Sequence, residues 1–305
     1  MYTGAAALLI ILCLTRPNSP DRGSMSIRAA EAAELAAGPL ARVWQGYRSH
    51  FITPEGRVVD NANGGISHSE GQGYAMLLAT RQDDKATFER LWQWTQTLAV
   101  REDGLFAWAW NPKADPNIQD LDDASDGNLL IAWALVEAAR RWDIPRYRSA
   151  GRAIAEAVWK QNVIETRFGP TLLPGSHGFS ARDRSDGPIV NLSYWVFPAF
   201  SRLAEVYPQA PWPKLSSAGL ELIRRARFGP RNLPPDWISL ADTKLAPAAG
   251  FSPVFGYDAI RVPLYLSWAY PNDRRRLMAF GSFSALPRIS PHLQCWSKTA
   301  SPWKN

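Results

Sequence analysis

The sequence predicts an all-α fold in which antiparallel helices form a toroid, and two observations support this prediction. Apolar residues recur at helical spacing through most of the chain, with turn-rich stretches such as 61–65 and 175–188 between the periodic segments. In the first segment, the i, i+3, i+4 and i+7 positions of one face hold Leu40, Val43, Trp44 and Tyr47. Many helices joined by long loops are typical of a helical ring.

About eight segments have this helical period. After the first, they follow in chain order at about 70–81, 84–98, 126–142, 145–161, 192–206, 212–227 and 257–268. The alternation of Phe106, Trp108 and Trp110 instead predicts a short strand or an extended rim segment.

Charge and cysteine content exclude several classes of protein. The net charge is +6, but Lys and Arg after residue 273 account for all of this excess, because that segment has no Asp or Glu. The rest of the chain is neutral, which argues against a nucleic-acid partner. Cys13 and Cys295 lie near opposite ends, so no disulfide framework is expected. The four histidines show no metal-ligand spacing, and neither a metal nor a cofactor is expected.

The two ends of the chain differ from its middle. Residues 5–14 form an apolar run too short to span a bilayer, and this run resembles the core of a signal peptide. We therefore expect a signal-like segment and linker over 1–25, a catalytic domain over 38–280, and a periplasmic or secreted protein. Residues 281–305 are rich in Ser and Pro and lack helical period, so we expect an irregular tail and a truncated or frameshifted C-terminus.

Three acidic residues stand in distinctive settings. Glu70 lies in HSEGQGY, Asp126 in ASDGN and Asp258 in GYDAIR, each after turn-forming or small residues and at the start of an apolar helical segment. Acids at the starts of different helices can converge at one end of a helical ring. Convergent carboxyl groups in a tryptophan-rich chain indicate a glycoside hydrolase, which needs one protonated and one ionised carboxyl group.

These motifs resemble the active-site segments of glycoside hydrolase family 8, in the same order and at similar spacing. The segment around Asp126, continuing to Trp142, is similar to the family signature, and the likeness covers roughly residues 43–277. The members that the chain resembles most are periplasmic endoglucanases encoded with bacterial cellulose synthase. The resemblance implies an (α/α)6 barrel with more helices than this sequence shows, so we expect the barrel to be incomplete at its C-terminal end.

The resemblance also implies the activity, that of an inverting endo-β-1,4-glucanase acting on cellulose-type β-glucan without a cofactor. We expect a monomer that is associated functionally with a cellulose synthase complex. Two alternatives stay open. The same fold can act on chitosan, xylan or mixed-linkage glucan, and a non-catalytic glucan-binding protein or decayed remnant would keep the aromatic residues without turnover.

The resemblance implies a role for each acid. Glu70 is the general acid, Asp258 the general base, and Asp126 binds the sugar beside the cleaved bond. An inverting pair stands about 6.5–9.5 Å apart, leaving room for a water. We expect Tyr257 and Arg261 to hold Asp258 ionised. Without the resemblance, each acid would be read as an ordinary helix start.

One position departs from the family pattern. The family usually has a second Asp two residues after the first, and here that place holds Asn128. An amide cannot carry the charge, so either substrate affinity is altered or the position is structural.

Aromatic residues in or near loops are candidates for stacking on sugar rings, because aromatic faces suit the C–H faces of pyranoses. The candidates are Trp108, Trp110, Tyr194, Trp195 and Trp237, with Tyr257 and Arg261 beside the proposed base. The sequence Asn191-Leu192-Ser193 matches a glycosylation acceptor, which we interpret as incidental.

Overall fold

The computed structural model describes residues 39–283, and the structural statements below refer to that part of the chain. It contains α3 (Pro39–Phe51), α4 (Ser69–Arg81), α5 (Lys85–Thr95), α6 (Ser125–Trp142), α7 (Pro145–Asn162), α8 (Phe197–Val206), α9 (Trp212–Arg225) and α10 (Arg261–Ala269). Three 3-10 segments accompany them: η1 (Gln96–Leu98), η2 (Leu192–Tyr194) and η3 (Arg274–Phe283).

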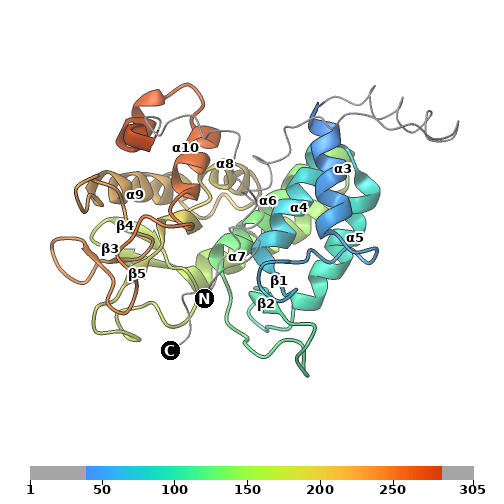
Figure 1. Ribbon diagram of the computed structural model, residues 1–305, viewed down its shortest axis with the longest axis horizontal. Helices are drawn as coiled ribbons and strands as arrows, with labels where there is room; N and C mark the ends of the chain where they lie inside the picture. Colours follow the sequence, from blue (N-terminus) through green and yellow to red (C-terminus); the bar gives the residue numbers. More distant parts are fainter. Residues whose placement is uncertain (1–38, 284–305) are drawn as a thin grey trace, which may run out of the picture.

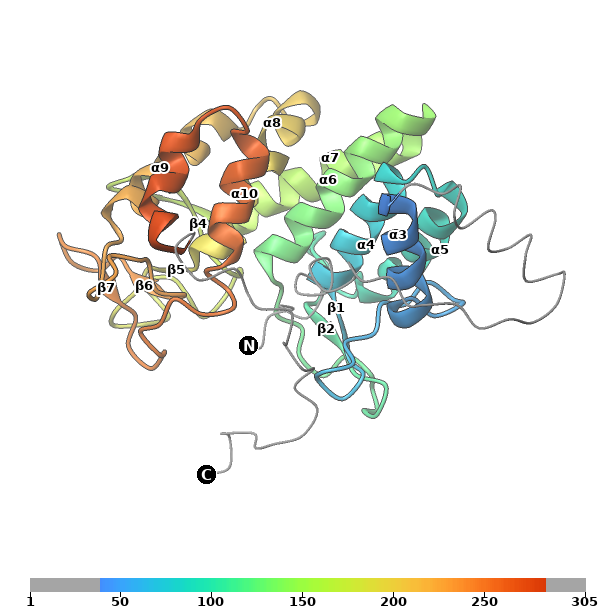
Figure 2. The ribbon, with the colours of Figure 1, turned by 45° about the horizontal axis from the view of Figure 1, so that its top comes forward.

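The helices follow one another around an arc, from α3, α4 and α5 at one side, through α6 and α7, to α8, α9 and α10 at the other (Figures 1 and 2). Along this arc α4 packs on α6, α6 on α8, and α8 on α10. Each of the intervening helices α5, α7 and α9 packs on the helix that precedes it in the chain. Inner and outer helices therefore alternate, which confirms the predicted all-α toroid.

Two glycines allow the close contact between α4 and α6. A Cβ placed on Gly73 would lie 2.5 Å from Leu130 Cβ and 3.0 Å from Ile131 N. A Cβ placed on Gly127 would overlap the side chain of Ser69. The first turns of the two helices are therefore brought together by the absence of side chains at these two positions.

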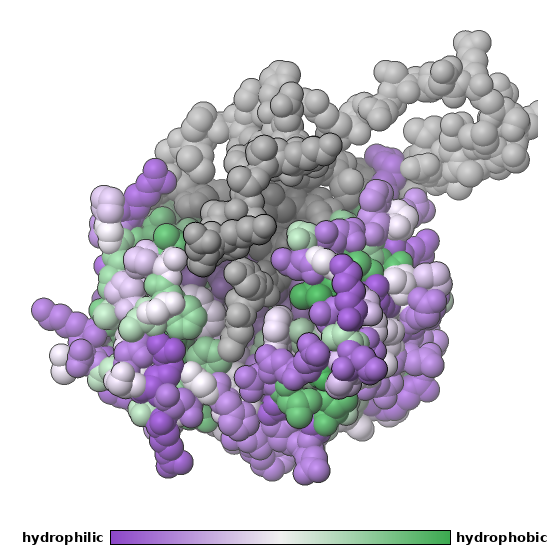
Figure 3. All heavy atoms as spheres, turned by 60° about the horizontal axis from the view of Figure 1, so that its bottom comes forward, coloured by the Kyte–Doolittle hydropathy of each residue, from purple (hydrophilic) through white to green (hydrophobic). Residues whose placement is uncertain are grey.

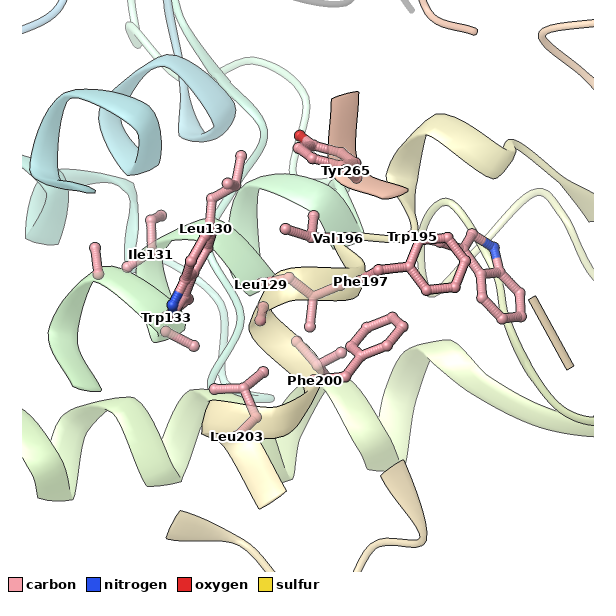
Figure 4. Packing of buried hydrophobic residues seen from close by; sticks show 14 of the residues in the cluster. Leu129, Leu130, Ile131, Trp133, Trp195, Val196, Phe197, Phe200, Leu203 and Tyr265 are labelled. Carbon is pink, nitrogen blue, oxygen red and sulfur yellow. The ribbon is translucent and has the colours of Figure 1, made fainter. Parts of the chain in front are cut away.

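The main core lies between α6, the η2–α8 segment and α10 (Figure 4). Its labelled members are Leu129, Leu130, Ile131 and Trp133 of α6, Trp195, Val196, Phe197, Phe200 and Leu203 of the η2–α8 segment, and Tyr265 of α10. Burial of such large apolar side chains stabilises the fold by about 1.5–3 kcal/mol each. Because these residues come from three inner helices, one core fixes how the inner ring is arranged.

Short strands line the loops at one end of the ring. They are β1 (Ser67–His68), β2 (Ala109–Trp110), β3 (Val163–Thr166), β4 (Gly169–Leu172), β5 (Ile189–Val190), β6 (Ile238–Ser239) and β7 (Ala246–Pro247). β1 pairs with β2 in antiparallel register, with Ser67 opposite Trp110. This pair confirms the extended segment predicted from the alternating aromatic residues. β3 pairs with β4, and β5, β6 and β7 form a three-stranded sheet.

Two predicted helix starts are wrong. The helix predicted from residue 192 begins at Phe197, since Pro198 fits only the first turn of a helix and the preceding residues form η2. The helix predicted from residue 257 begins at Arg261, because backbone N–H groups of Gly256 and Ala259 donate to the side chain of Asp236. Both corrections come from contacts that helical periodicity does not reveal.

Several predictions concern residues 1–38 and 284–305, which lie outside the described residues. The signal-like segment, the incomplete C-terminal end and most of the irregular tail therefore stay predictions. The described residues end with η3, which extends to Phe283. Between residues 39 and 283, no helix is both long and apolar enough to cross a membrane.

Substituting Gly73 tests whether the α4–α6 approach depends on a missing side chain. Helix propensity alone predicts that Gly73→Ala stabilises the protein by about 1 kcal/mol. The Cβ clash with Leu130 predicts the opposite sign, a loss of about 1–3 kcal/mol through overpacking. Guanidinium unfolding measures the difference, and an increase in the free energy of unfolding would contradict the packing argument.

Candidate active site

The three predicted acids lie at one end of the inner ring. Glu70 is in the first turn of α4, and Asp126 is in the first turn of α6. Asp258 lies in the turn that leads into α10. Side chains far apart in the sequence thus meet because inner helices begin on the same side of the ring.

The guanidinium of Arg261 joins all three acids. Its Nη1 contacts Glu70 Oε1 and lies 2.8 Å from Asp126 Oδ2. Its Nη2 lies 3.5 Å from Asp258 Oδ1. Arg261 is only 1% exposed, so this is a buried cluster of one cation and three carboxyl groups. Arg261 was predicted to pair with Asp258 alone, and the structure shows that it also contacts Glu70 and Asp126.

Burial dominates the titration of the cluster. It raises the pKa of Asp258 to about 6, against the lowering effect of Arg261. Burial, followed by the negative charge of Glu70, also raises the pKa of Asp126. With three carboxyl groups around one guanidinium, full ionisation would leave two negative charges uncompensated in a buried site. Asp126 and Asp258 therefore stay protonated to higher pH than carboxyl groups in water do.

Asn191 and Ser193 complete a hydrogen-bonded path between Asp258 and Arg261. Asn191 Nδ2 donates to Asp258 Oδ2 at 3.1 Å, and Asn191 Oδ1 accepts from Ser193 Oγ at 2.7 Å. Arg261 Nη2 in turn donates to Ser193 Oγ at 2.8 Å. Sequence analysis missed this role, because the Asn-Leu-Ser triplet indicates only a glycosylation acceptor. Asn191 is buried and bound to the candidate base.

Asp236 holds the turn that carries Asp258. Its Oδ1 accepts hydrogen bonds from the backbone of Gly256 and of Ala259, both at 2.9 Å. A Cβ on Gly256 would overlap the Asp236 carboxylate, so this turn requires glycine there. No local signal marks Asp236 in the sequence, because its partners are in a distant loop.

Asn128 is structural. Its Oδ1 accepts from Phe106 N at 3.0 Å, and its Nδ2 donates to Ala124 O at 3.0 Å. An ionised Asp cannot donate to a carbonyl, so the amide suits this environment. The residue that departs from the family pattern is therefore fully buried with both ends of its amide bonded.

Trp108 and Trp110 lie at the rim beside Glu70. The carbonyl of Trp108 accepts from Ser69 N at 2.9 Å, and its indole donates to Asp120 at 2.8 Å. Trp110 packs edge-on against Trp94. Both indoles keep partial exposure, which is compatible with the predicted sugar contact.

The other aromatic candidates divide into exposed and buried residues. Tyr257 is 69% exposed beside Asp258, whereas Tyr194 is buried against the guanidinium of Arg261. Trp195 is 0% exposed, and Trp237 is buried and stacked on Phe251. The predictions that Tyr194, Trp195 and Trp237 stack on sugars are wrong, because all three rings are buried.

On the face that carries the strand-bearing loops, hydrophilic side chains prevail at the right of the view around a compact hydrophobic patch, and hydrophilic and hydrophobic side chains are mixed at the left (Figure 3). Among residues 39–283, no group of three or more His, Cys, Asp or Glu side chains has the arrangement of a metal site. The cation that the three acids share in this structure is Arg261.

Comparison with known proteins gives a consistent result. The family model of glycosyl hydrolases family 8 matches residues 22–292. The chain is 42% identical over 257 residues to an endoglucanase of Cellulomonas uda, covering 83% of this chain and 71% of that protein.

Solved structures agree with the sequence match. A family 8 endo-β-1,4-glucanase from an Achatina fulica gut metagenomic library has a TM-score of 0.76 and 43% identity, covering 81% of this chain and 78% of that one. The endo-β-1,4-glucanase CMCax from Acetobacter xylinum has a TM-score of 0.75 and 39% identity, covering 80% and 76%. These similarities confirm the (α/α)6 barrel as the fold class.

The raised pKa of Asp258 predicts a pH-dependent effect on stability. The pKa of Asp258 is about 6 in the folded state, against an ordinary pKa of 3.8. The free energy of unfolding therefore falls as pH rises from 3.8 to about 6, and the whole loss is present above about pH 6. Asp258→Asn should therefore increase the free energy of unfolding by about 1–3 kcal/mol at pH 8 and leave it nearly unchanged near pH 3.5.

Glu221→Gln is the control of opposite sign, measured by the same unfolding experiments. Hydrogen bonds from Arg224 and Arg225 lower the pKa of Glu221 to about 2. Its ionised form stabilises the fold above the ordinary pKa, so this variant should be less stable at pH 8. An Asp258→Asn protein that is no more stable than the wild type at pH 8 would contradict the burial argument.

Proposed function

This chain belongs to glycosyl hydrolases family 8, and on that premise we propose that it is an inverting endo-β-1,4-glucanase that cleaves cellulose-type β-glucan. The observation that carries this proposal is the convergence of Glu70, Asp126 and Asp258 on Arg261. The printed names of the similar proteins, endoglucanase and endo-β-1,4-glucanase, support the choice of substrate.

Glu70 is the proposed general acid, which protonates the glycosidic oxygen as the bond to the leaving sugar breaks. For this it must hold a proton in the enzyme–substrate complex. The convergence on Arg261 supports this role, because it brings the buried Glu70 together with the candidate base and a third carboxyl group. The first turn of α4 places Glu70 beside the rim residue Trp108.

Asp258 is the proposed general base, which takes a proton from the attacking water. With a pKa of about 6 it is ionised at neutral pH yet remains basic enough to accept that proton. Asn191 and Arg261 each bind one of its oxygens, and this orients the carboxylate. Attack by water on the face opposite the leaving group inverts the anomeric centre.

Asp126 is the proposed ligand of hydroxyl groups on the sugar beside the cleaved bond. It shares Nη1 of Arg261 with Glu70, so it also contributes negative charge close to the acid. The proposed aromatic contacts to further sugars are Trp108, Trp110 and Tyr257, and Tyr194 acts through its packing on Arg261. Aromatic platforms bind sugar rings with little loss of conformational entropy.

We also propose that the enzyme works as a monomer in the periplasm or outside the cell, in functional association with a cellulose synthase complex. The apolar run at residues 5–14 and a polymeric substrate found outside the cytoplasm support this location. The sequence resemblance to endoglucanases encoded with cellulose synthase supports the association.

Hydrolysis of a soluble cello-oligosaccharide, followed by proton NMR from the first minutes, tests the proposal. We expect new reducing ends to appear first as the α-anomer, because water replaces the leaving group on the opposite face of a β-glycoside. Initial release of β-anomer would contradict inversion. Cleavage of xylan, chitosan or mixed-linkage glucan, with the cello-oligosaccharide left intact, would contradict the proposed substrate.

Glu70→Gln is the matched control in the same assay. The amide keeps the shape of the side chain and removes the proton donor, so kcat should fall by about 10²–10⁴-fold. Binding of the oligosaccharide, measured by calorimetry, should persist. Turnover near the wild-type rate would remove Glu70 from the mechanism.

A further inference from the structure

A buried Asp–His pair lies directly behind the start of α4, outside the acid cluster. His68 is the residue that precedes α4, and it has an extended backbone. Its Nδ1 accepts a hydrogen bond from Gly71 N at 3.1 Å, and its Nε2 lies 3.3 Å from Asp60 Oδ2. Both side chains are buried, with 7% of His68 and 6% of Asp60 exposed.

These contacts define one tautomer of the imidazole. Because Nδ1 accepts from a backbone N–H, it carries no proton, and the ring proton must be on Nε2. That proton points to Asp60 Oδ2. A histidine protonated on both nitrogens would have no acceptor left for Gly71, so this helix cap requires the neutral ring.

Asp60 is itself held in place. Asn63 Nδ2 donates to its Oδ2 at 2.6 Å, and Ala62 N donates to its Oδ1 at 3.0 Å. Although burial opposes ionisation, hydrogen bonds from His68 and Asn63 lower the pKa of Asp60 to about 2. Asp60 is thus a fixed anion that orients the imidazole throughout the neutral range.

The cap acts on the backbone that carries Glu70. On one side of Glu70, Ser69 N donates to Trp108 O at 2.9 Å, and on the other, Gly71 N donates to His68 Nδ1. A Cβ on Gly71 would stand 3.2 Å from His68 Cε1, so glycine leaves room for the ring against the first turn. The residues on both sides of Glu70 thus have their backbone N–H groups hydrogen-bonded.

We propose that His68, oriented by Asp60, is a positioning residue for the catalytic acid: it fixes the first turn of α4 and thereby the path along which Glu70 reaches the glycosidic oxygen. This inference rests on the proposed function of Glu70. His68 itself does not touch the reacting atoms. Its contribution is geometric, and errors in the placement of catalytic groups approaching 1 Å cost on the order of 10²-fold in rate.

Two substitutions distinguish the role of Nδ1, which caps α4, from that of Nε2, which contacts Asp60. The Oδ1 of Asn can replace Nδ1 as the acceptor for Gly71, and Asn is a favoured cap residue. Gln reaches further, toward Asp60, and leaves Gly71 N without its cap. We expect His68→Asn to keep kcat within about threefold of the wild type because the cap persists. We expect His68→Gln to lower kcat by about 10- to 100-fold with KM changed less than about twofold.

Asp84→Ala is the matched control for stability. Asp84 caps α5 by accepting from Thr87 N at 3.1 Å, and it also accepts from Trp44 and Arg48, so its removal costs a helix cap and two further contacts. It should lower Tm at least as much as His68→Gln does, while kcat stays at the wild-type value. A His68→Gln protein with wild-type kcat, or an Asp84→Ala protein with the same loss of kcat, would overturn the positioning role.

Nitrogen-15 NMR of the His68 ring provides a readout that does not depend on activity. We expect the neutral Nε2–H tautomer at pH 7, and the Nδ1–H tautomer or a charged ring would overturn the proposal. If the wild-type protein fails to cleave β-1,4-glucan, the proposed function fails, whereas the tautomer measurement still decides whether His68 caps α4 as described.

Discussion

The requirement that three buried carboxyl groups share one buried guanidinium organises this end of the fold. A charge out of water must be paired and hydrogen-bonded, since an unpaired buried charge costs several kcal/mol. For Arg261 to reach both Glu70 and Asp126, the first turns of α4 and α6 must nearly touch, which Gly73 and Gly127 permit. The close approach of α4 and α6 is thus required by the contacts of the charge cluster.

The same cluster explains why the site is poised for acid–base chemistry at some expense of stability. Burial raises the pKa of Asp258 and of Asp126, so their ionised forms destabilise the folded state. The surrounding hydrogen bonds orient each carboxyl group. Asn191, for example, donates to Oδ2 of Asp258. Enzyme sites commonly place such perturbed groups where a proton must be given or accepted near neutral pH.

Much of this architecture was predictable from the sequence, and the errors have physical causes. Helices such as α3, α8 and α9 have strong apolar periodicity, and the acids stand in short local motifs. Asn191 and Asp236 were missed because their partners are distant in the chain. Trp195 was misassigned because a position near a loop does not determine burial, which here depends on packing against α9 at Gly219.

Carbon-13 NMR titration of the side-chain carboxyl groups tests the central claim, that Arg261 is the counter-ion of the acid cluster. In the wild type, Asp258 should titrate near pH 6 and Asp126 above the ordinary range of aspartate. In Arg261→Met, both should titrate at still higher pH, because the positive charge that favours their ionised forms is gone. Titration of both groups near pH 4 in the wild type, or unchanged curves in the variant, would contradict this account.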